Sequence, residues 1–218
     1  MTLRRAKVKR PYQSPLRDGQ ARNTRTAIIE AAWRLFAERG YAATSIDEIA
    51  TAAGVGRATV FTSVGGKAHL LKAAFDVAIV GDDEKVSLPD RPRSRVIRAE
   101  PDPRRDLTLY AELIAELGER FAPIAEAARG AAGADRDARD LWRSHLAQRR
   151  QGAANVVKDL LSKGARLREG LDETSAADVV WVLNDPGLYS HLVIQQGWEP
   201  TRFSKWLGDA MRRELLQD

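Results

Sequence analysis

The spacing of apolar residues constrains the fold of this chain more than any other feature of the sequence. Within residues 24–39 the apolar side chains recur at i, i+1, i+4, i+7 and i+8, which places them on one face of a helix. The same period returns in residues 67–80 and through residues 106–217. No stretch alternates apolar and polar residues over the length of a strand, and no segment repeats. The spacing therefore predicts an all-α protein.

Local signals divide the first helical region into short helices. Gly40 follows the first helix as a C-terminal cap, and Ser45 with Glu48 has the spacing of a capping box that begins a second helix. Gly54 ends that helix, and a third short helix is expected from about residue 57 to residue 63. Two short helices joined by a glycine-containing turn are typical of a helix-turn-helix, although ordinary helical bundles contain similar corners.

Composition divides the chain into four stretches. Residues 1–22 combine many charges with few apolar side chains, and we expect them to form a disordered basic arm. Residues 23–80 form the compact block that contains the helix-turn-helix pattern. Residues 81–105 hold four prolines and dense mixed charge without a period, so they are predicted to be a linker or mobile loop. Residues 106–218 return to helical spacing as a second domain, in which Pro123 is expected to kink or split a helix.

Composition also excludes several classes of protein. The chain has no cysteine, so disulfides, thiol catalysis and thiolate metal sites are excluded. No apolar run approaches the ~20 residues that span a membrane, and no apolar segment of a secretory signal follows the basic N-terminus. Three histidines without metal-ligand spacing, and the lack of a phosphate loop or nucleophile motif, argue against an enzyme. We expect a soluble cytoplasmic protein without catalytic activity, metal or cofactor.

Charge is concentrated at the N-terminus. The whole chain carries a formal charge of +5, whereas residues 1–25 alone hold eight basic residues and a single acidic one. A basic arm on an otherwise nearly neutral chain is typical of a protein that binds a polyanion such as double-stranded DNA. The alternative is a solvated tail with no partner.

Residues 28–71 closely resemble the DNA-binding domain of the TetR family of bacterial transcriptional regulators. Agreement spread over about 44 positions is far more specific than a short motif. Residues 183–198 also resemble the sensor domain of some members, with the sequence LNDPGLYSHLVIQQGW. The matching residues of the first domain are Ala31, Ala32, Leu35, Phe36, Gly40, Tyr41, Thr44, Ser45, Ile46, Ile49, Ala50, Ala53, Gly54, Val55, Thr59, Val60, Phe61, Lys67, Leu70 and Leu71.

The resemblance implies an N-terminal three-helix DNA-binding domain and a C-terminal helical bundle for ligand sensing and dimerisation. It also implies a homodimeric repressor that binds a palindromic operator and is released by a small-molecule effector. A DNA-binding regulator without a ligand, or an activator, remains the alternative. The sequence departs from the family pattern at Gly56, at Phe61 where Tyr is common, and at residues 62–64, which predicts a different operator sequence or weaker binding.

Chemistry assigns roles within the proposed recognition helix, residues 57–63. Arg57 can bond the O6 and N7 edge of guanine, and Ala58 or Thr59 can contact a thymine methyl. Thr44, Ser45 and Lys67 lie at helix N-termini, where a phosphate is favoured. The alternative for Ser45 is that it only caps its helix, and the alternative for Lys67 is that it is a solvated lysine in the first turn. The predicted DNA-contacting residues are Arg22, Arg25, Thr44, Ser45, Arg57, Ala58, Thr59, Phe61, Thr62, Ser63 and Lys67.

The second domain is predicted to contain the dimer interface and the ligand pocket. The apolar faces of its last two helices either pair with a second subunit or fill the core of one chain. The predicted interface residues are Leu188, Leu192, Phe203, Trp206, Leu207, Met211 and Leu215. A pocket with aromatic walls and few polar groups suits an apolar small molecule, although most such aromatics serve only packing. The predicted ligand-binding residues are Tyr110, Trp142, His145, Trp181, Asn184 and Tyr189.

Overall fold

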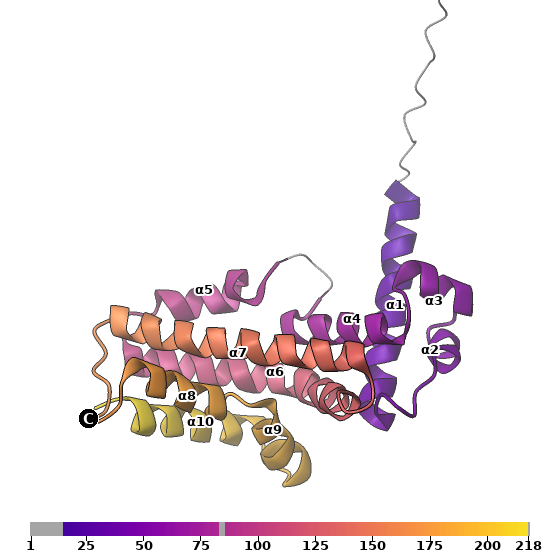
Figure 1. The fold of residues 1–218 in the computed structure, drawn as a ribbon. Helices are drawn as coiled ribbons and strands as arrows, with labels where there is room; N and C mark the ends of the chain where they lie inside the picture. Colours follow the sequence, from indigo (N-terminus) through magenta and orange to yellow (C-terminus); the bar gives the residue numbers. More distant parts are fainter. Residues whose placement is uncertain (1–14, 83–85, 218) are drawn as a thin grey trace, which may run out of the picture.

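The computed structural model describes residues 15–82 and 86–217. Helices make up these segments, and no named strand occurs among them, so the all-α prediction is confirmed (Figure 1). The first four helices are α1 Pro15–Arg39, α2 Ile46–Ala52, α3 Arg57–Ser63 and α4 Lys67–Val80. They form one end of the molecule, and the remaining helices form an elongated bundle beside them (Figure 1).

Helix α1 is longer than the sequence pattern predicts. It begins at Pro15 instead of residue 24, so the expectation of disorder is wrong for residues 15–22, and residues 1–14 lie outside the described residues. Proline is favoured in the first turn of a helix because its missing N–H would be unpaired there. Residues 16–25 include three arginines, which favour helix, but they also include Gly19 and carry no apolar stripe. Periodicity therefore gave no sign of this extension.

The segment between the two predicted domains is also largely ordered. It contains a short 3-10 helix, η1 Leu88–Asp90, and helix α5 Pro92–Ala99, whose Ile97 is buried against α6 Pro103–Ala131. The predicted linker over residues 81–105 is thus wrong for most of its length. Pro92 and Pro103 each occupy the start of a helix, so these prolines begin helices instead of marking a loop.

The bundle is built around α6. This helix continues through Pro123 without being split, contrary to one of the two predicted outcomes, and it packs against α1, α4, α7 and α10. Its other elements are α7 Arg136–Ser162, α8 Glu173–Leu183, the single turn α9 Pro186–Tyr189, the π-helical segment η2 Ser190–Gln195, and α10 Pro200–Leu215. Every described helix is too short or too polar to cross a membrane.

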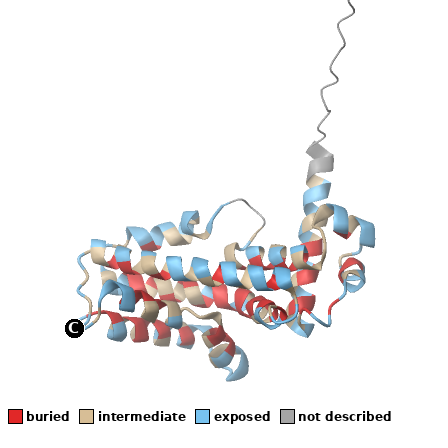
Figure 2. Cartoon of the chain, viewed as in Figure 1, coloured by how far each residue is buried: buried red, intermediate tan, exposed pale blue. Residues whose placement is uncertain are grey.

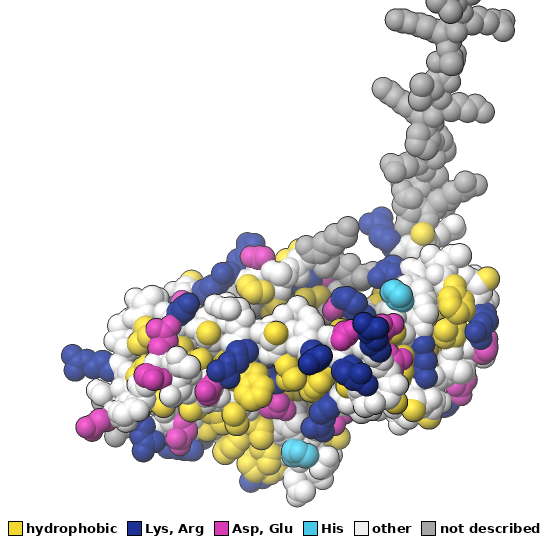
Figure 3. All heavy atoms as spheres, in the orientation of Figure 1, with side chains coloured by type: hydrophobic (Ala, Val, Ile, Leu, Met, Phe, Trp, Pro, Cys, Tyr) yellow, Lys and Arg dark blue, Asp and Glu magenta, His cyan; other side chains and the backbone are white. Residues whose placement is uncertain are grey.

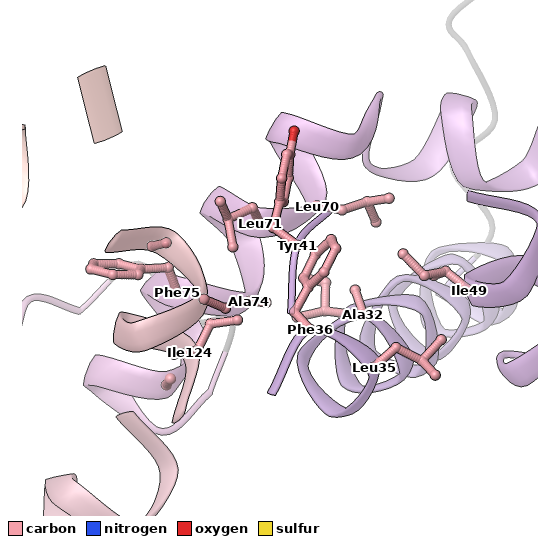
Figure 4. Packing of buried hydrophobic residues seen from close by; sticks show 14 of the residues in the cluster. Ala32, Leu35, Phe36, Tyr41, Ile49, Leu70, Leu71, Ala74, Phe75 and Ile124 are labelled. Atoms are coloured by element: carbon pink, nitrogen blue, oxygen red, sulfur yellow. The ribbon is translucent and has the colours of Figure 1, made fainter. Parts of the chain in front are cut away.

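Two large apolar cores run through the described part of the molecule (Figure 2). The first joins Phe36 of α1, Ile49 of α2 and Leu70 of α4 to Phe75 and to Ile124 of α6 (Figure 4). These side chains are fully or almost fully buried. Because one core includes residues of α1–α4 and of α6, the helix-turn-helix and the bundle pack directly on each other.

The last helix corrects part of the predicted dimer interface. Phe203, Leu207, Met211 and Leu215 are each 0% exposed in the single chain and belong to its second core. At Gly208 the helices α10 and α6 are in direct contact, since a Cβ there would lie at the van der Waals distance of 3.5 Å from the Ala111 side chain of α6. The inward face of α10 therefore fills the subunit core, which was the alternative. The other three predicted residues, Leu188, Leu192 and Trp206, keep part of their surface exposed.

Candidate nucleic-acid interface and ligand cavity

The helix-turn-helix is fixed by local hydrogen bonds. The Glu48 backbone N–H donates to Ser45 Oγ at 3.2 Å, and the Ser45 N–H donates to Glu48 Oε2 at 2.8 Å, so the predicted capping box is confirmed. Gly54 adopts φ +67°, a conformation that side-chain-bearing residues rarely take, and this turns the chain from α2 into α3. The Ser45 hydroxyl also contacts the Glu48 carboxylate. A carboxylate of the protein itself thus occupies this helix N-terminus, which argues against a phosphate contact by Ser45.

Helix α3 presents one face to solvent. Arg57, Ala58, Phe61 and Thr62 are exposed, while Val60 on the opposite face is completely buried. The predicted residues Thr59 and Ser63 are half-buried at the edges of this exposed face. Side chains of Lys and Arg lie around the end of the molecule that carries α1 and α3 (Figure 3). The exposed face is therefore available to a groove of double-stranded DNA.

Arg57 is held loosely in the free protein. Its Nη1 pairs with Asp47 of α2, and its guanidinium lies over the Phe61 ring at 5.4 Å from the centroid. The two paired side chains are 54% and 67% exposed, so the pair contributes little stability and can open. Phe61 is 45% exposed, and its ring lies under the Arg57 guanidinium. The residue at this position therefore has a contact that does not require the hydroxyl of a tyrosine.

Two other side chains that were predicted to contact DNA form hydrogen bonds within the protein instead. The Thr44 side chain is buried and donates to the carbonyls of Leu35 at 3.2 Å and Gly40 at 2.9 Å, so the prediction that it contacts DNA is wrong. Arg25 Nη1 donates to the Ser63 carbonyl at 2.8 Å, which ties α1 to the C-terminal end of α3. Arg22 is exposed one turn earlier on α1.

Lys67 begins a chain of contacts that the sequence did not reveal. Its Nζ lies 4.4 Å from the centroid of the Tyr41 ring, and partial burial lowers the pKa of this amine. The Tyr41 hydroxyl in turn donates to Asp135 Oδ2 at 2.7 Å. Asp135 is the N-cap of α7, whose Ala138 N–H it accepts. One predicted phosphate contact is therefore connected to the helix that lines the cavity described next.

A cavity of about 740 Å³ lies among α4, α6, α7 and the segment from residue 184 to residue 189. Its walls are mainly apolar, with contributions from Ile79, Leu113, Ile114, Leu117 and Phe121. This size and lining suit a small organic molecule. Of the predicted ligand-binding residues, the structure brings Tyr110, His145, Asn184 and Tyr189 to the cavity. Trp142 and Trp181 do not line it, because Trp142 packs in the first core and Trp181 in the second.

Arg149 organises the polar end of this cavity. Its side chain is 8% exposed, and Nη1 donates to Asp185 Oδ2 at 2.9 Å. Nη2 donates to the Trp181 carbonyl at 2.7 Å and to Asn184 Oδ1 at 2.9 Å. Asn184 Nδ2 donates to the Tyr110 hydroxyl at 2.9 Å. Sequence reasoning missed Arg149, although its place four residues after His145 on the buried face of α7 was a usable signal.

His145 lies at the meeting point of three helices. Its ring centroid is 4.9 Å from Phe75 of α4, 5.1 Å from Phe121 of α6 and 5.4 Å from Trp142 on its own helix. Burial, reinforced by the positive charge of Arg149, lowers the pKa of His145 to about 4. The ring is therefore neutral at physiological pH. His145 Nε2 has no hydrogen-bond partner among the described residues.

Comparison with known proteins places this arrangement among bacterial regulators. Residues 28–74 match the sequence model of the family described as "Bacterial regulatory proteins, tetR family". The HTH-type transcriptional regulator TtgR of Pseudomonas putida is 44% identical over 57 residues, which are 26% of this chain and 27% of that protein. The match thus spans about a quarter of that relative's length.

Two further similarities extend over most of the chain. The uncharacterized HTH-type transcriptional regulator YdeS of Bacillus subtilis is 28% identical over 162 residues, covering 72% of this chain and 74% of the relative. The crystal structure of native NalD, the secondary repressor of the MexAB-OprM multidrug efflux pump in Pseudomonas aeruginosa, superposes with a TM-score of 0.68. That superposition has 25% sequence identity and covers 91% of this chain and 99% of NalD.

Proposed function

The chain belongs to the TetR family of bacterial regulatory proteins, and on this premise we propose that it is a ligand-responsive transcriptional repressor. The observation that carries the proposal is the exposed face of α3, formed by Arg57, Ala58, Phe61 and Thr62 behind a capped α2. A helix presented in this way can enter the major groove and contact base edges through its first residues. The proposed role is binding without catalysis, in the cytoplasm, with no cofactor.

Two chains are proposed to bind one palindromic operator. A two-fold dimer would place its two α3 helices about 34 Å apart, which is one turn of DNA. Apolar side chains gather over α8, α9 and the segment that follows them (Figure 3). Val182 of α8 and Ile194 of η2 are 55% and 54% exposed, and Leu188, Leu192 and Trp206, on α9, η2 and α10, are partly exposed. We propose that these residues, and not the buried face of α10, form the dimer surface.

Release from DNA is proposed to follow from a shift in population. Helix α4 lines the cavity through Asp76, Ile79 and Val80, and it packs on α1 through the first core. A ligand that fits the cavity better when α4 is displaced would favour conformations in which the two α3 helices are wrongly spaced for the operator. NalD, to which the chain is similar, is a repressor by its description, and this supports repression over activation.

Selection from a pool of random DNA duplexes tests this proposal. The purified protein should enrich an inverted repeat whose half-sites are about one helical turn apart. Enrichment of a single half-site would contradict the dimer, and a pool that stays random after repeated rounds would contradict sequence-specific binding. An enriched site whose affinity no cavity-binding compound alters would leave a DNA-binding regulator without a ligand as the correct function.

A further inference from the structure

The hydrogen bonds at the polar end of the cavity have a fixed direction. Arg149 only donates, so the Asn184 atom that faces Nη2 at 2.9 Å must be the oxygen. The amide nitrogen of Asn184 then faces the Tyr110 hydroxyl, which must accept at 2.9 Å. The series of hydrogen bonds therefore runs from the Arg149 cation through Asn184 to Tyr110, and each donor polarises the next.

This series of hydrogen bonds ends at a donor, the Tyr110 hydroxyl, that has no acceptor among the described residues. Tyr110 accepts from Asn184, so its own O–H hydrogen points elsewhere, and no described residue accepts it. Tyr110 lines the cavity, as do Arg149 and His145, whose Nε and Nε2 atoms also lack partners within the described part of the chain. An unsatisfied buried donor is costly, so an acceptor is expected beside the Tyr110 hydroxyl and Arg149 Nε when the site is filled.

The charges around the cavity are already balanced. The described ionisable lining residues besides His145 and the tyrosines are Asp76, Arg149 and Asp185. Arg149 is paired with Asp185 at 2.9 Å, and Asp76 is paired with Lys72 outside the cavity. His145 is neutral at physiological pH because burial lowers its pKa. Among these described lining residues, no unpaired cation is therefore left to bind an anionic group, and no unpaired anion to bind a cationic one.

From these contacts we infer that the cavity takes an uncharged, mainly apolar molecule with one carbonyl-type oxygen that accepts the Tyr110 O–H. The inference rests on the proposed function, in which this cavity is the effector site. Apolar contact with Ile114, Leu117 and Phe121 supplies most of the binding, and the polarised hydroxyl fixes the ligand's orientation. Burial also raises the pKa of Tyr110, so the hydroxyl stays protonated as a donor at neutral pH.

Fluorescence of the uncharged naphthyl ketone prodan, measured on the intact chain without DNA, tests the inference. Prodan emission shifts to the red when its carbonyl accepts a hydrogen bond. The wild type should bind prodan with red-shifted emission, and should bind its carbonyl-free 6-propyl analogue and anilinonaphthalene sulfonate about tenfold more weakly. Tyr110→Phe should weaken prodan binding about tenfold and move the emission to the blue. Ser87→Ala removes a hydroxyl at the rim of the same cavity that already donates to Asp90 Oδ2 at 2.6 Å, and it should change neither.

A second variant tests the direction of these hydrogen bonds. Asn184→Asp offers only acceptor atoms, so the Tyr110 hydroxyl would donate to the new carboxylate instead of to a ligand. This variant should therefore behave like Tyr110→Phe although the hydroxyl is still present. Unchanged affinity and emission in both variants, an equal loss in Ser87→Ala, or tighter binding of the sulfonate than of prodan would each overturn the inference. Melting curves of every variant report whether it folds. Operator binding is measured separately, so its failure would refute the proposed function alone.

Discussion

At the scale of single residues, His145 shows how burial sets a charge state. The ring is 6% exposed and packed among three aromatic side chains, so a proton on it would be poorly solvated. Its pKa of about 4 lies below the usual value of 6.5. Between these two values the unfolded chain binds a proton that the folded chain does not. Stability from this group is therefore complete at neutral pH and is lost as the pH falls.

Replacement of His145 by Gln should make stability less dependent on pH. Between pH 7 and pH 5 the lowered pKa of His145 should cost the wild type about 2 kcal/mol of unfolding free energy relative to a residue that does not titrate. Urea unfolding of wild type and His145→Gln at both pH values measures the difference. Parallel losses in the two proteins would show that His145 titrates normally in the folded state.

Arg57 is the residue on which DNA recognition should depend most. Arg57→Ala should weaken binding to the selected operator by roughly tenfold to a hundredfold, because a bidentate contact with guanine discriminates by about 1–3 kcal/mol. Arg143→Ala is the matched control, since Arg143 is an exposed arginine on a different helix, α7. Fluorescence anisotropy with the operator duplex gives both affinities. Equal affinities of the two variants would refute the base contact.

At the scale of elements, the success of prediction depended on whether a signal was local. The capping box at Ser45 and the turn at Gly54 follow from a few adjacent residues, so α2 and α3 were correctly predicted. Helix α5 was missed because Pro92 and Pro103 are equally compatible with loops and with helix starts, and only packing of Ile97 on α6 decides between them.

The cavity was only partly predictable for a similar reason. Tyr110, His145, Asn184 and Tyr189 were identified as polar or aromatic residues on apolar faces, and they do line the cavity. Arg149 was missed because an arginine is usually exposed, and its burial depends on acceptors from α8 and the following turn that are over thirty residues away. Likewise, an apolar face such as that of α10 is equally suited to a subunit core and to an interface.

Helix α6 provides a test of how closely elements pack around the cavity. A Cβ at Gly118 would overlap the Tyr189 ring, so Gly118→Ala should force α9 away from α6 and destabilise the chain by about 1–3 kcal/mol. Gly130→Ala makes the same change on the same helix with nothing within 4 Å, and should be neutral or stabilising by up to about 1 kcal/mol. Thermal unfolding compares them. Equal melting temperatures would contradict this packing.

At the scale of the whole molecule, the helix-turn-helix and the bundle are joined by specific bonds as well as by a shared core. Trp33 Nε1 of α1 donates to the Arg120 carbonyl at 2.8 Å, and Arg120 Nε donates to the Ala78 carbonyl of α4 at 2.8 Å. The Tyr41–Asp135 bond joins the same end to α7. These bonds resist independent motion of the two parts. Such coupling is required if a ligand in the bundle is to change the position of α3.

Dimerisation should depend on the apolar surface over α8 to α10. Val182→Asp places a charge on the proposed interface and should shift the chain from dimer to monomer. Val96→Asp is the control, because Val96 is also 55% exposed but lies on α5. Sedimentation equilibrium of both variants distinguishes the two surfaces. A Val182→Asp variant that remains as dimeric as the wild type would place the interface elsewhere.

Binding of the intact protein to its selected operator measures whether α3 recognises DNA sequence. Anisotropy titrations would compare the operator duplex with a scrambled duplex of equal length at low and high salt. We expect two chains per operator duplex, at least about a thousandfold preference over the scrambled duplex, and affinity that falls as salt rises. Equal affinity for the two duplexes at every salt concentration would contradict it, because the exposed face of α3 would then not recognise DNA sequence.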